Sequence, residues 1–97
     1  IVPQKFSLDQ NYPNPFNPMT TISYRLPKTA VVSLKIYNLL GQQVRTLVDE
    51  LQKPGSYTAQ WDGKGEQGLE LPSGVYFYRL RVDRDKFVET KKMLLLR

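Results

Sequence analysis

Three carboxylates in one glycine-rich loop are the residues of this chain best suited to chemistry. The segment WDGKGEQGLELPSG, residues 61–74, contains Asp62, Glu66 and Glu70. Carboxylate oxygens are the ligands that Ca²⁺ prefers, but the order of these acids does not follow the EF-hand pattern. The preferred alternative is a structural loop, in which glycines allow positive φ and Asp62 accepts hydrogen bonds from nearby backbone N–H groups.

Catalysis by these acids is disfavoured. A glycosidase uses two carboxylates beside the scissile bond, and Asp62, Glu66, Glu70 and Glu89 could supply such a pair. The pair needs a shared cleft, and a chain of 97 residues has little volume for one beside its core. Histidine and cysteine are absent, which removes histidine acid–base chemistry, Ser-His and Cys-His nucleophiles, disulfides and typical zinc sites. The sequence therefore predicts a domain that is not an enzyme and uses no cofactor.

Positive charge offers a candidate binding surface. The formal net charge is +5 and the pI is about 9.6, which suits an anionic glycan or a lipid headgroup surface. Nucleic acid is disfavoured, because no signature of a nucleic-acid-binding module is present. Four cations take outward positions on predicted strands: Arg25, Lys35, Arg79 and Arg81. They form a basic stripe if those strands are neighbours, and an ordinary solvated face otherwise.

Aromatic side chains offer a second surface, a platform on which sugars could stack. The candidates are Tyr12, Tyr37, Tyr57, Trp61, Phe77 and Tyr78. A β-sandwich fills its centre from the inward positions of both sheets, so most of these side chains are expected in the core. Only Tyr37 and Phe77 have the outward parity that a platform requires.

Strands must position all of these side chains, and alternating hydrophobicity predicts about seven of them. The expected ranges are 6–8, 20–26, 31–38, 43–49, 56–61, 75–83 and 86–96. A type II turn is expected at Pro54-Gly55 and a tight hairpin at Arg84-Asp85, whereas a helical turn near 46–51 ranks below strand. This spacing indicates an all-β, immunoglobulin-like sandwich of antiparallel strands, expected to be a monomer. The longest apolar run, 93–96, is too short to cross a bilayer.

The segment NYPNPFNP, residues 11–18, is predicted to be rigid without joining a central strand. Proline lacks a backbone donor, fixes φ and restricts the residue before it, so three prolines in eight residues exclude a helix interior and a ladder. We expect the asparagines to bond nearby backbone. We expect Tyr12 and Phe16 to plug one end of the sandwich.

Five motifs together resemble a known family. They are NYPNPFNP at 11–18, IYNLLGQQV at 36–44, WDGKGEQG at 61–68, SGVYFYRL at 73–80 and KKMLLLR at 91–97. Their order and spacing resemble the C-terminal sorting domain (type A) of proteins exported by the type IX secretion system of Bacteroidetes-like bacteria. The set is also similar to the immunoglobulin-like part of the flagellar hook-capping protein. The resemblance covers residues 6–97 and leaves 1–5 as the remnant of an interdomain linker.

Particular residues carry the resemblance. The candidate sorting and recognition residues are Asn11, Pro13, Asn14, Pro15, Phe16, Asn17, Pro18, Lys92, Met93 and Leu95. The residues that match the structural motifs are Gly41, Val44, Trp61, Asp62, Gly63, Gly68, Gly74 and Tyr76. Met19, Asn38 and Gly65 depart from residues common in the family, and Gly65 removes one potential calcium ligand.

The resemblance implies a role in transport. Such domains are non-catalytic secretion signals of larger exported proteins, recognised by the type IX translocon. A sortase-like peptidase often removes them and joins the cargo to anionic lipopolysaccharide, so the implied location is the cell surface or the extracellular space. An alternative is an accessory carbohydrate-binding or spacer module of a secreted glycoside hydrolase. A further hypothesis is that the edge of the last strand is offered to the translocon for β-augmentation.

Overall fold

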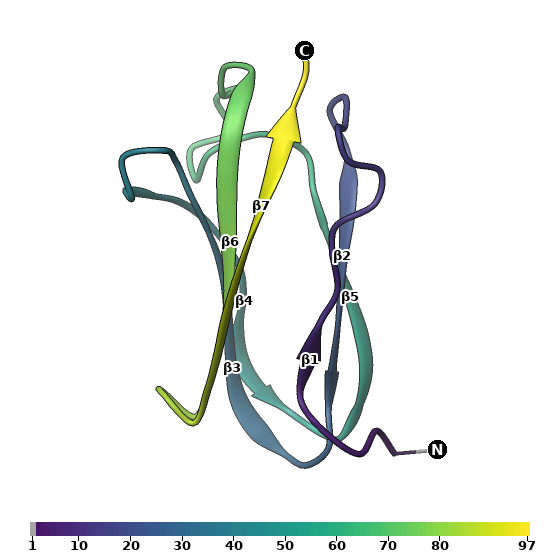
Figure 1. The fold of residues 1–97 in the computed structure, drawn as a ribbon. Helices are drawn as coiled ribbons and strands as arrows, with labels where there is room; N and C mark the ends of the chain where they lie inside the picture. The colour runs from purple at the N-terminus through teal and green to yellow at the C-terminus, as the bar shows by residue number, and fades with distance from the viewer. Residues whose placement is uncertain (1) are drawn as a thin grey trace.

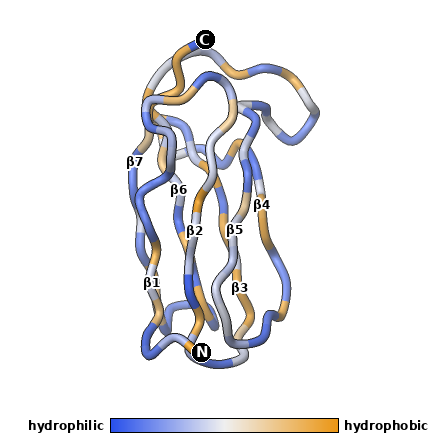
Figure 2. Tube along the Cα trace, turned by 90° about the vertical axis from the view of Figure 1, so that its right-hand side faces the viewer, coloured by the Kyte–Doolittle hydropathy of each residue, from blue (hydrophilic) through white to orange (hydrophobic). Residues whose placement is uncertain are grey.

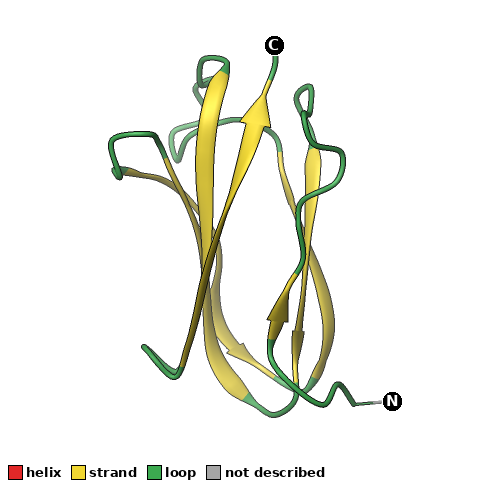
Figure 3. Cartoon of the chain, in the orientation of Figure 1, coloured by secondary structure: helices red, strands yellow, loops and turns green. Residues whose placement is uncertain are grey.

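The chain forms two antiparallel β-sheets that pack face to face. The computed structural model describes residues 2–97, and Ile1, part of the predicted linker 1–5, lies outside them. The strands are β1 (Ser7–Leu8), β2 (Thr20–Leu26), β3 (Ala30–Tyr37), β4 (Gln43–Gln52), β5 (Gly55–Trp61), β6 (Gly74–Val82) and β7 (Phe87–Leu95). One sheet has the order β1-β2-β5 and the other β4-β3-β6-β7 (Figure 1). The seven predicted strands are therefore all present. Loops make the other connections (Figure 3), and no helix of residues 2–97 could span a membrane.

Period-two alternation explains why these segments are strands. Along β3, Val32, Leu34 and Ile36 are fully buried, while the residues between them are not. The inward positions of β6 alternate in the same way. Hydrophobic and hydrophilic residues accordingly interchange along the trace (Figure 2). Each sheet thus buries one face against the other, as in an aligned sandwich.

Strand β4 departs most from its predicted form. It continues to Gln52, and its pairing with β3 shifts register at Leu34/Lys35 and at Ile36/Tyr37. Each shift places an extra residue in β4, which explains why its hydrophobic residues mix both parities. The segment 46–51 is part of this strand, which confirms the prediction of strand over a helical turn.

Two connections differ from their predicted geometry. Pro54 and Gly55 lead from one sheet to the other, and Gly55 has φ 150° rather than the roughly +80° of a type II turn. The β6–β7 hairpin begins one residue earlier than expected, with positive φ at Asp83 and Arg84. Asp83 also anchors β3, since its carboxylate accepts from the Val31 N–H at 2.9 Å and its own N–H donates to the Val31 carbonyl at 2.8 Å.

An aromatic cluster fills one end of the core. The centroids of the Phe16 and Trp61 rings lie 5.7 Å apart. Those of Trp61 and Tyr76 lie 5.4 Å apart in an edge-on arrangement. Phe16 is 2% exposed, as expected of a plug, but the same expectation for Tyr12 is wrong, because Tyr12 is 81% exposed. The backbone of Tyr12 exchanges two hydrogen bonds with Thr21. In this extended geometry its neighbour Asn11 points inward, so Tyr12 points to solvent.

Two buried tyrosine hydroxyls form hydrogen bonds that link β2 to β4 and link β6 to the segment before the prolines. The Tyr24 hydroxyl donates to Gln52 Oε1 at 2.7 Å. The Tyr78 hydroxyl donates to the Asp9 carbonyl and accepts from the Asn11 N–H, both at 2.8 Å. Burial disfavours the phenolate and raises the pKa of Tyr24 and of Tyr78 to about 12.

These pKa values predict alkaline destabilisation. Below pH 10 both phenols are neutral in the folded and unfolded states, so their contribution is fully present. Between pH 10 and 12 the unfolded chain loses these protons first, and the free energy of unfolding falls by about 1.4 kcal/mol per tyrosine at pH 11. Urea unfolding at pH 9 and pH 11 should show a smaller fall for Tyr24→Phe than for the parent. Equal falls would contradict the assignment.

The aromatic cluster yields a stability prediction. Phe16→Ala should lower the free energy of unfolding by about 3–5 kcal/mol, because a buried ring is lost from a packed site. Tyr12→Ala, the matched control in the same motif, should change it by less than about 0.5 kcal/mol. Urea denaturation at neutral pH measures both. Equal losses would show that Phe16 is not the plug.

Candidate functional site

All five sequence motifs meet at one end of the sandwich. This motif end comprises segments 11–18, 38–44, 61–76 and 92–97, which lie near the C-terminus in Figure 1. Trp61 contacts both Phe16 and Tyr76, and the Glu66 N–H donates to the Val44 carbonyl at 3.0 Å. Residues far apart in the sequence thus build one structural unit.

The first motif pairs directly with the last strand. The Phe16 N–H donates to the Leu94 carbonyl at 3.0 Å, and the Leu96 N–H donates to the Phe16 carbonyl at 2.9 Å. The Leu94 N–H donates to Asn14 Oδ1 at 3.0 Å, and Gln10 Nε2 donates to the Lys92 carbonyl at 2.8 Å. We call these contacts between residues 10–16 and 92–96 the seam. The seam occupies half of the free edge of β7.

Asn11 makes the proline segment rigid. It is 2% exposed, and its Nδ2 donates to Thr20 Oγ1 at 2.9 Å and to the Pro13 carbonyl at 3.2 Å. Thr20 Oγ1 donates to the same carbonyl at 2.8 Å. The other predicted recognition residues of this segment, apart from Phe16, remain exposed: Pro13, Asn14, Pro15, Asn17 and Pro18. Among those of the last strand, Lys92 is exposed, whereas Met93 and Leu95 are buried.

Arg97 fastens the terminal segment to the loop 61–74. Its N–H donates to Ser73 Oγ at 2.8 Å, and its guanidinium donates to the carbonyls of Leu71 and, at 2.6 Å, Gly63. Gly63 has φ 75°, and a Cβ there would lie 2.8 Å from Arg97 Nη2. Glycine at this position therefore permits both the turn and the approach of Arg97.

The acids of this loop form ion pairs with arginine side chains of the same domain. Asp62 Oδ1 accepts from the Lys64 N–H at 3.1 Å and lies 3.3 Å from Arg45 Nη1. Glu66 lies 3.7 Å from Arg45 Nε, and Glu70 lies 3.8 Å from Arg97 Nη1. Glu89, the fourth catalytic candidate, pairs with Lys91 on β7 at 3.3 Å. Within residues 2–97, no three His, Cys, Asp or Glu side chains gather as a metal-ion site requires.

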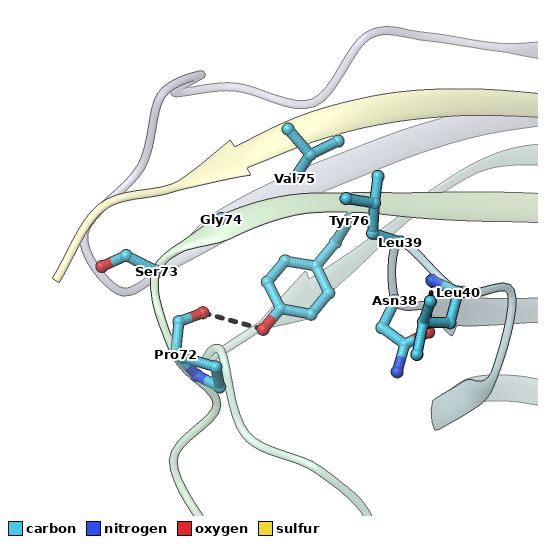
Figure 4. A pocket seen from close by; sticks show the side chains of 8 residues that line it. All are labelled: Asn38, Leu39, Leu40, Pro72, Ser73, Gly74, Val75 and Tyr76. Carbon is cyan, nitrogen blue, oxygen red and sulfur yellow. Dashed lines mark hydrogen bonds between the residues drawn. The ribbon is translucent and has the colours of Figure 1, made fainter.

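The remaining structural residues shape turns at the same end. Gly41 lies in the β3–β4 hairpin, Gly68 in the exposed loop and Gly74 at the start of β6. The Tyr76 hydroxyl donates to the Pro72 carbonyl at 2.7 Å, beside an open pocket of about 260 Å³ (Figure 4). The pocket lies between this loop and the hairpin that carries Leu39 and Leu40.

The four predicted basic residues do not form one stripe. Lys35 and Arg79 are register partners on β3 and β6, and Arg81 follows on β6. Arg25 lies on β2 in the other sheet, where it pairs with Asp9 at 2.9 Å. The reason is topological: the chain crosses the sandwich between β2 and β3, so these two strands belong to opposite sheets although they are adjacent in sequence.

The aromatic candidates also separate. Tyr37 and Phe77 are register partners on the outer face of the four-stranded sheet, and the Arg79 guanidinium lies 5.0 Å from the centre of the Tyr37 ring. Trp61 and Tyr78 are buried. The Tyr57 ring stacks on the Tyr24 ring with their centroids 5.5 Å apart, and Tyr12 is exposed.

Sequence reasoning missed the residues that join the motifs. Gln10, Arg45 and Arg97 each connect segments far apart in the chain. Their residue types are common on any surface, so only the strand order and register identify them. Asn14 was selected from its motif, but its partner Leu94 was not.

Comparisons with known proteins agree on the fold. PorU from Porphyromonas gingivalis, described as dimeric and latent, matches with TM-score 0.72, 22% identity and 99% of this chain. PorZ, described as an essential bacterial surface component of the type-IX secretion system of the same organism, matches with TM-score 0.63, 22% identity and 95% coverage. FlgD from P. aeruginosa matches with TM-score 0.61 and 24% identity over 81% of this chain and 66% of its own. The predicted immunoglobulin-like sandwich is thus confirmed.

The matched proteins are longer than this chain. It spans 10% of the PorU chain and 11% of the PorZ chain. No curated protein matches its sequence. The family model for the FlgD Ig-like domain, however, matches residues 16–86, well over half of the sequence. The chain therefore belongs to the FlgD Ig-like domain family.

Proposed function

We propose that residues 6–97 are a non-catalytic C-terminal secretion signal and cell-surface attachment module of a larger exported bacterial protein. The type IX translocon would recognise the module, and a sortase-like peptidase would process it. Residues 1–5 would link it to its cargo, and anionic lipopolysaccharide would be the attachment partner. The proposal extends the sequence resemblance, and the likeness to a segment of PorZ, a surface component of that system, supports it.

One observation carries the proposal: which part of the chain each comparison includes. The FlgD family match ends at residue 86, immediately before β7, and begins at Phe16. The structural match to FlgD covers 81% of the chain, whereas those to PorU and PorZ cover 99% and 95%, so that they leave at most 5% of the whole chain, β7 and the proline segment included, unmatched. The seam is made by these two segments, and it is the feature expected to distinguish a sorting domain from a general FlgD-type domain.

The geometry suits recognition of a folded domain. The seam places exposed Pro13, Asn14 and Pro15 close to exposed Lys92. A receptor could therefore contact the first and last motifs on one surface, and only when both are folded. This would let the translocon reject a module in which these two segments are not folded together.

The hypothesis of β-augmentation at the last strand applies to only part of the edge of β7. Residues 92, 94 and 96 already bond across the free edge of β7 to the seam. In the described chain, no such backbone bond reaches this edge at Val88 or Thr90. An added strand would therefore have only this lower half of β7 available.

Glycan binding has weaker support. Tyr37 and Phe77 do lie side by side in register, as a sugar platform requires. Yet Arg79 already lies over the Tyr37 ring, on the surface that a sugar would use. Retention in a polysaccharide affinity gel that is lost on Phe77→Ala would favour this alternative.

A transport assay tests the proposed function. A periplasmic reporter is fused before residue 1 and expressed in a host with a type IX system, with surface reporter measured on intact cells. The reporter should reach the surface, and it should remain inside an otherwise identical strain that lacks the translocon. Deleting residues 92–97 is a poor control, because Met93 and Leu95 belong to the core and their loss would unfold the domain.

A fold-matched control is the Ig-like domain of P. aeruginosa FlgD in the same fusion. It belongs to the same family, so it tests whether the fold alone is sufficient. The FlgD fusion should stay inside the cell. Equal display of both fusions, or retention of both, would contradict the proposal.

A further inference from the structure

The two outer faces of the sandwich have different chemistry. On the three-stranded sheet, the outward side chains of β2 and β5 are small or polar: Thr21, Ser23, Arg25, Ser56, Thr58 and Gln60. No large hydrophobic side chain is among them, and exposed Tyr12, which pairs with Thr21, is the large aromatic residue at the edge of this face. This is the usual composition of a solvated sheet face.

The outer face of the four-stranded sheet is apolar and basic. We define it, the β3–β6 face, as the outward side chains of β4, β3, β6 and β7. Its apolar members include Val31 at 51%, Leu51 at 67% and Val88 at 45% exposure. Its cations are Lys35, Arg79, Arg81 and Lys92. Exposed hydrophobic groups gathered with charge of one sign mark interaction surfaces.

The register arranges this face in rows. Lys35 lies opposite Arg79, and Ser33 lies opposite Arg81, so cations occupy the middle rows. Val31 lies opposite Leu51 at one end of the face. At the other end, Phe77 lies between Tyr37 and Lys92. The middle rows therefore form a basic centre that also contains Val88, opposite Arg81, and the end rows are apolar apart from Lys92.

A hollow in the basic centre suits a carboxylate. It has a volume of about 220 Å³ and is lined by Val31, Ser33, Lys35, Arg81 and Arg84. Arg81 has an acidic neighbour in Asp85 at 2.8 Å, but this acid is 80% exposed and such a pair is weak. The outward acid of β4, Asp49, lies opposite Ser33. The face thus keeps an excess of cations.

We propose that the β3–β6 face docks a protein partner whose surface presents carboxylates between apolar side chains. Four strands about 4.8 Å apart and nine residues long give roughly 15 by 30 Å, within the range of a small protein interface. A second copy of this chain would oppose like charges at the basic centre. A lipid surface is disfavoured, because the carboxylates of Asp49 and Asp85 lie beside these cations and a uniformly anionic surface would repel them.

The inference rests on the proposed function, since the partner would be a component of the export machinery. The test uses the reporter fusion with Lys35→Glu/Arg81→Glu and, as a charge-matched control, Lys5→Glu/Lys53→Glu, two exposed residues outside the strands. Surface reporter should fall at least tenfold in the first variant and stay within twofold of the parent in the second. Leu51→Ser should lower it severalfold without changing any charge.

Thermal unfolding of the purified domains separates docking from folding. The Lys35→Glu/Arg81→Glu domain should melt within a few degrees of the parent. If that variant does not fold, Lys35→Gln/Arg81→Gln is used in its place. If the parent is displayed and these variants are displayed equally, the docking face is refuted while the proposed function stands. If the parent is not displayed, the proposed function fails and the inference with it.

Sedimentation with lipid vesicles tests whether a membrane surface, rather than a protein, binds the β3–β6 face. Vesicles with 30% anionic phospholipid are sedimented with the parent domain and with Lys35→Glu/Arg81→Glu. Neither protein should pellet. Pelleting of the parent alone would assign the face to a lipid surface and overturn the protein partner.

Discussion

The insertion of Phe16 between Trp61 and the last strand is the contact on which the motif end depends. Its ring is almost fully buried beside Trp61, and its backbone pairs with Leu94 and Leu96. A proline-rich segment offers few backbone donors of its own. Holding it in place therefore requires both the buried ring and the side-chain bonds of Asn11 and Asn14. The same contact covers an edge that would otherwise be open for unwanted pairing.

Alternating hydrophobicity along the chain was sufficient to predict the strands. Each strand buries one face, so its own residues show which side chains point inward. The strand order could not be predicted in this way, because it depends on where the chain crosses between sheets. Arg25 shows the consequence: its outward parity was predicted correctly, but it lies on the opposite sheet from Lys35 and Arg79. The bulges of β4 show another limit, since they arise from pairing with β3.

The candidate site shows the same division. Phe16 and Trp61 could be selected from motif and hydrophobicity, and both are in the core. Tyr12 could not be distinguished from Phe16 by type, because backbone pairing with Thr21 decides which of them points outward. Arg97 ends the last motif and Gln10 precedes the first, but nothing local in the sequence indicates their contacts. Their roles appear only when the proline segment, the loop 61–74 and β7 lie together.

The central structural claim is that the proline segment and the terminal strand form one unit, and amide hydrogen exchange tests it most directly. The Phe16, Leu94 and Leu96 N–H groups donate only across the seam. Their exchange should be as slow as that of the β6 amides, and Asn14→Ala should accelerate exchange at Leu94 while leaving β6 slow. Exchange of these three amides at the rate of exposed loops in the parent domain would contradict the claim.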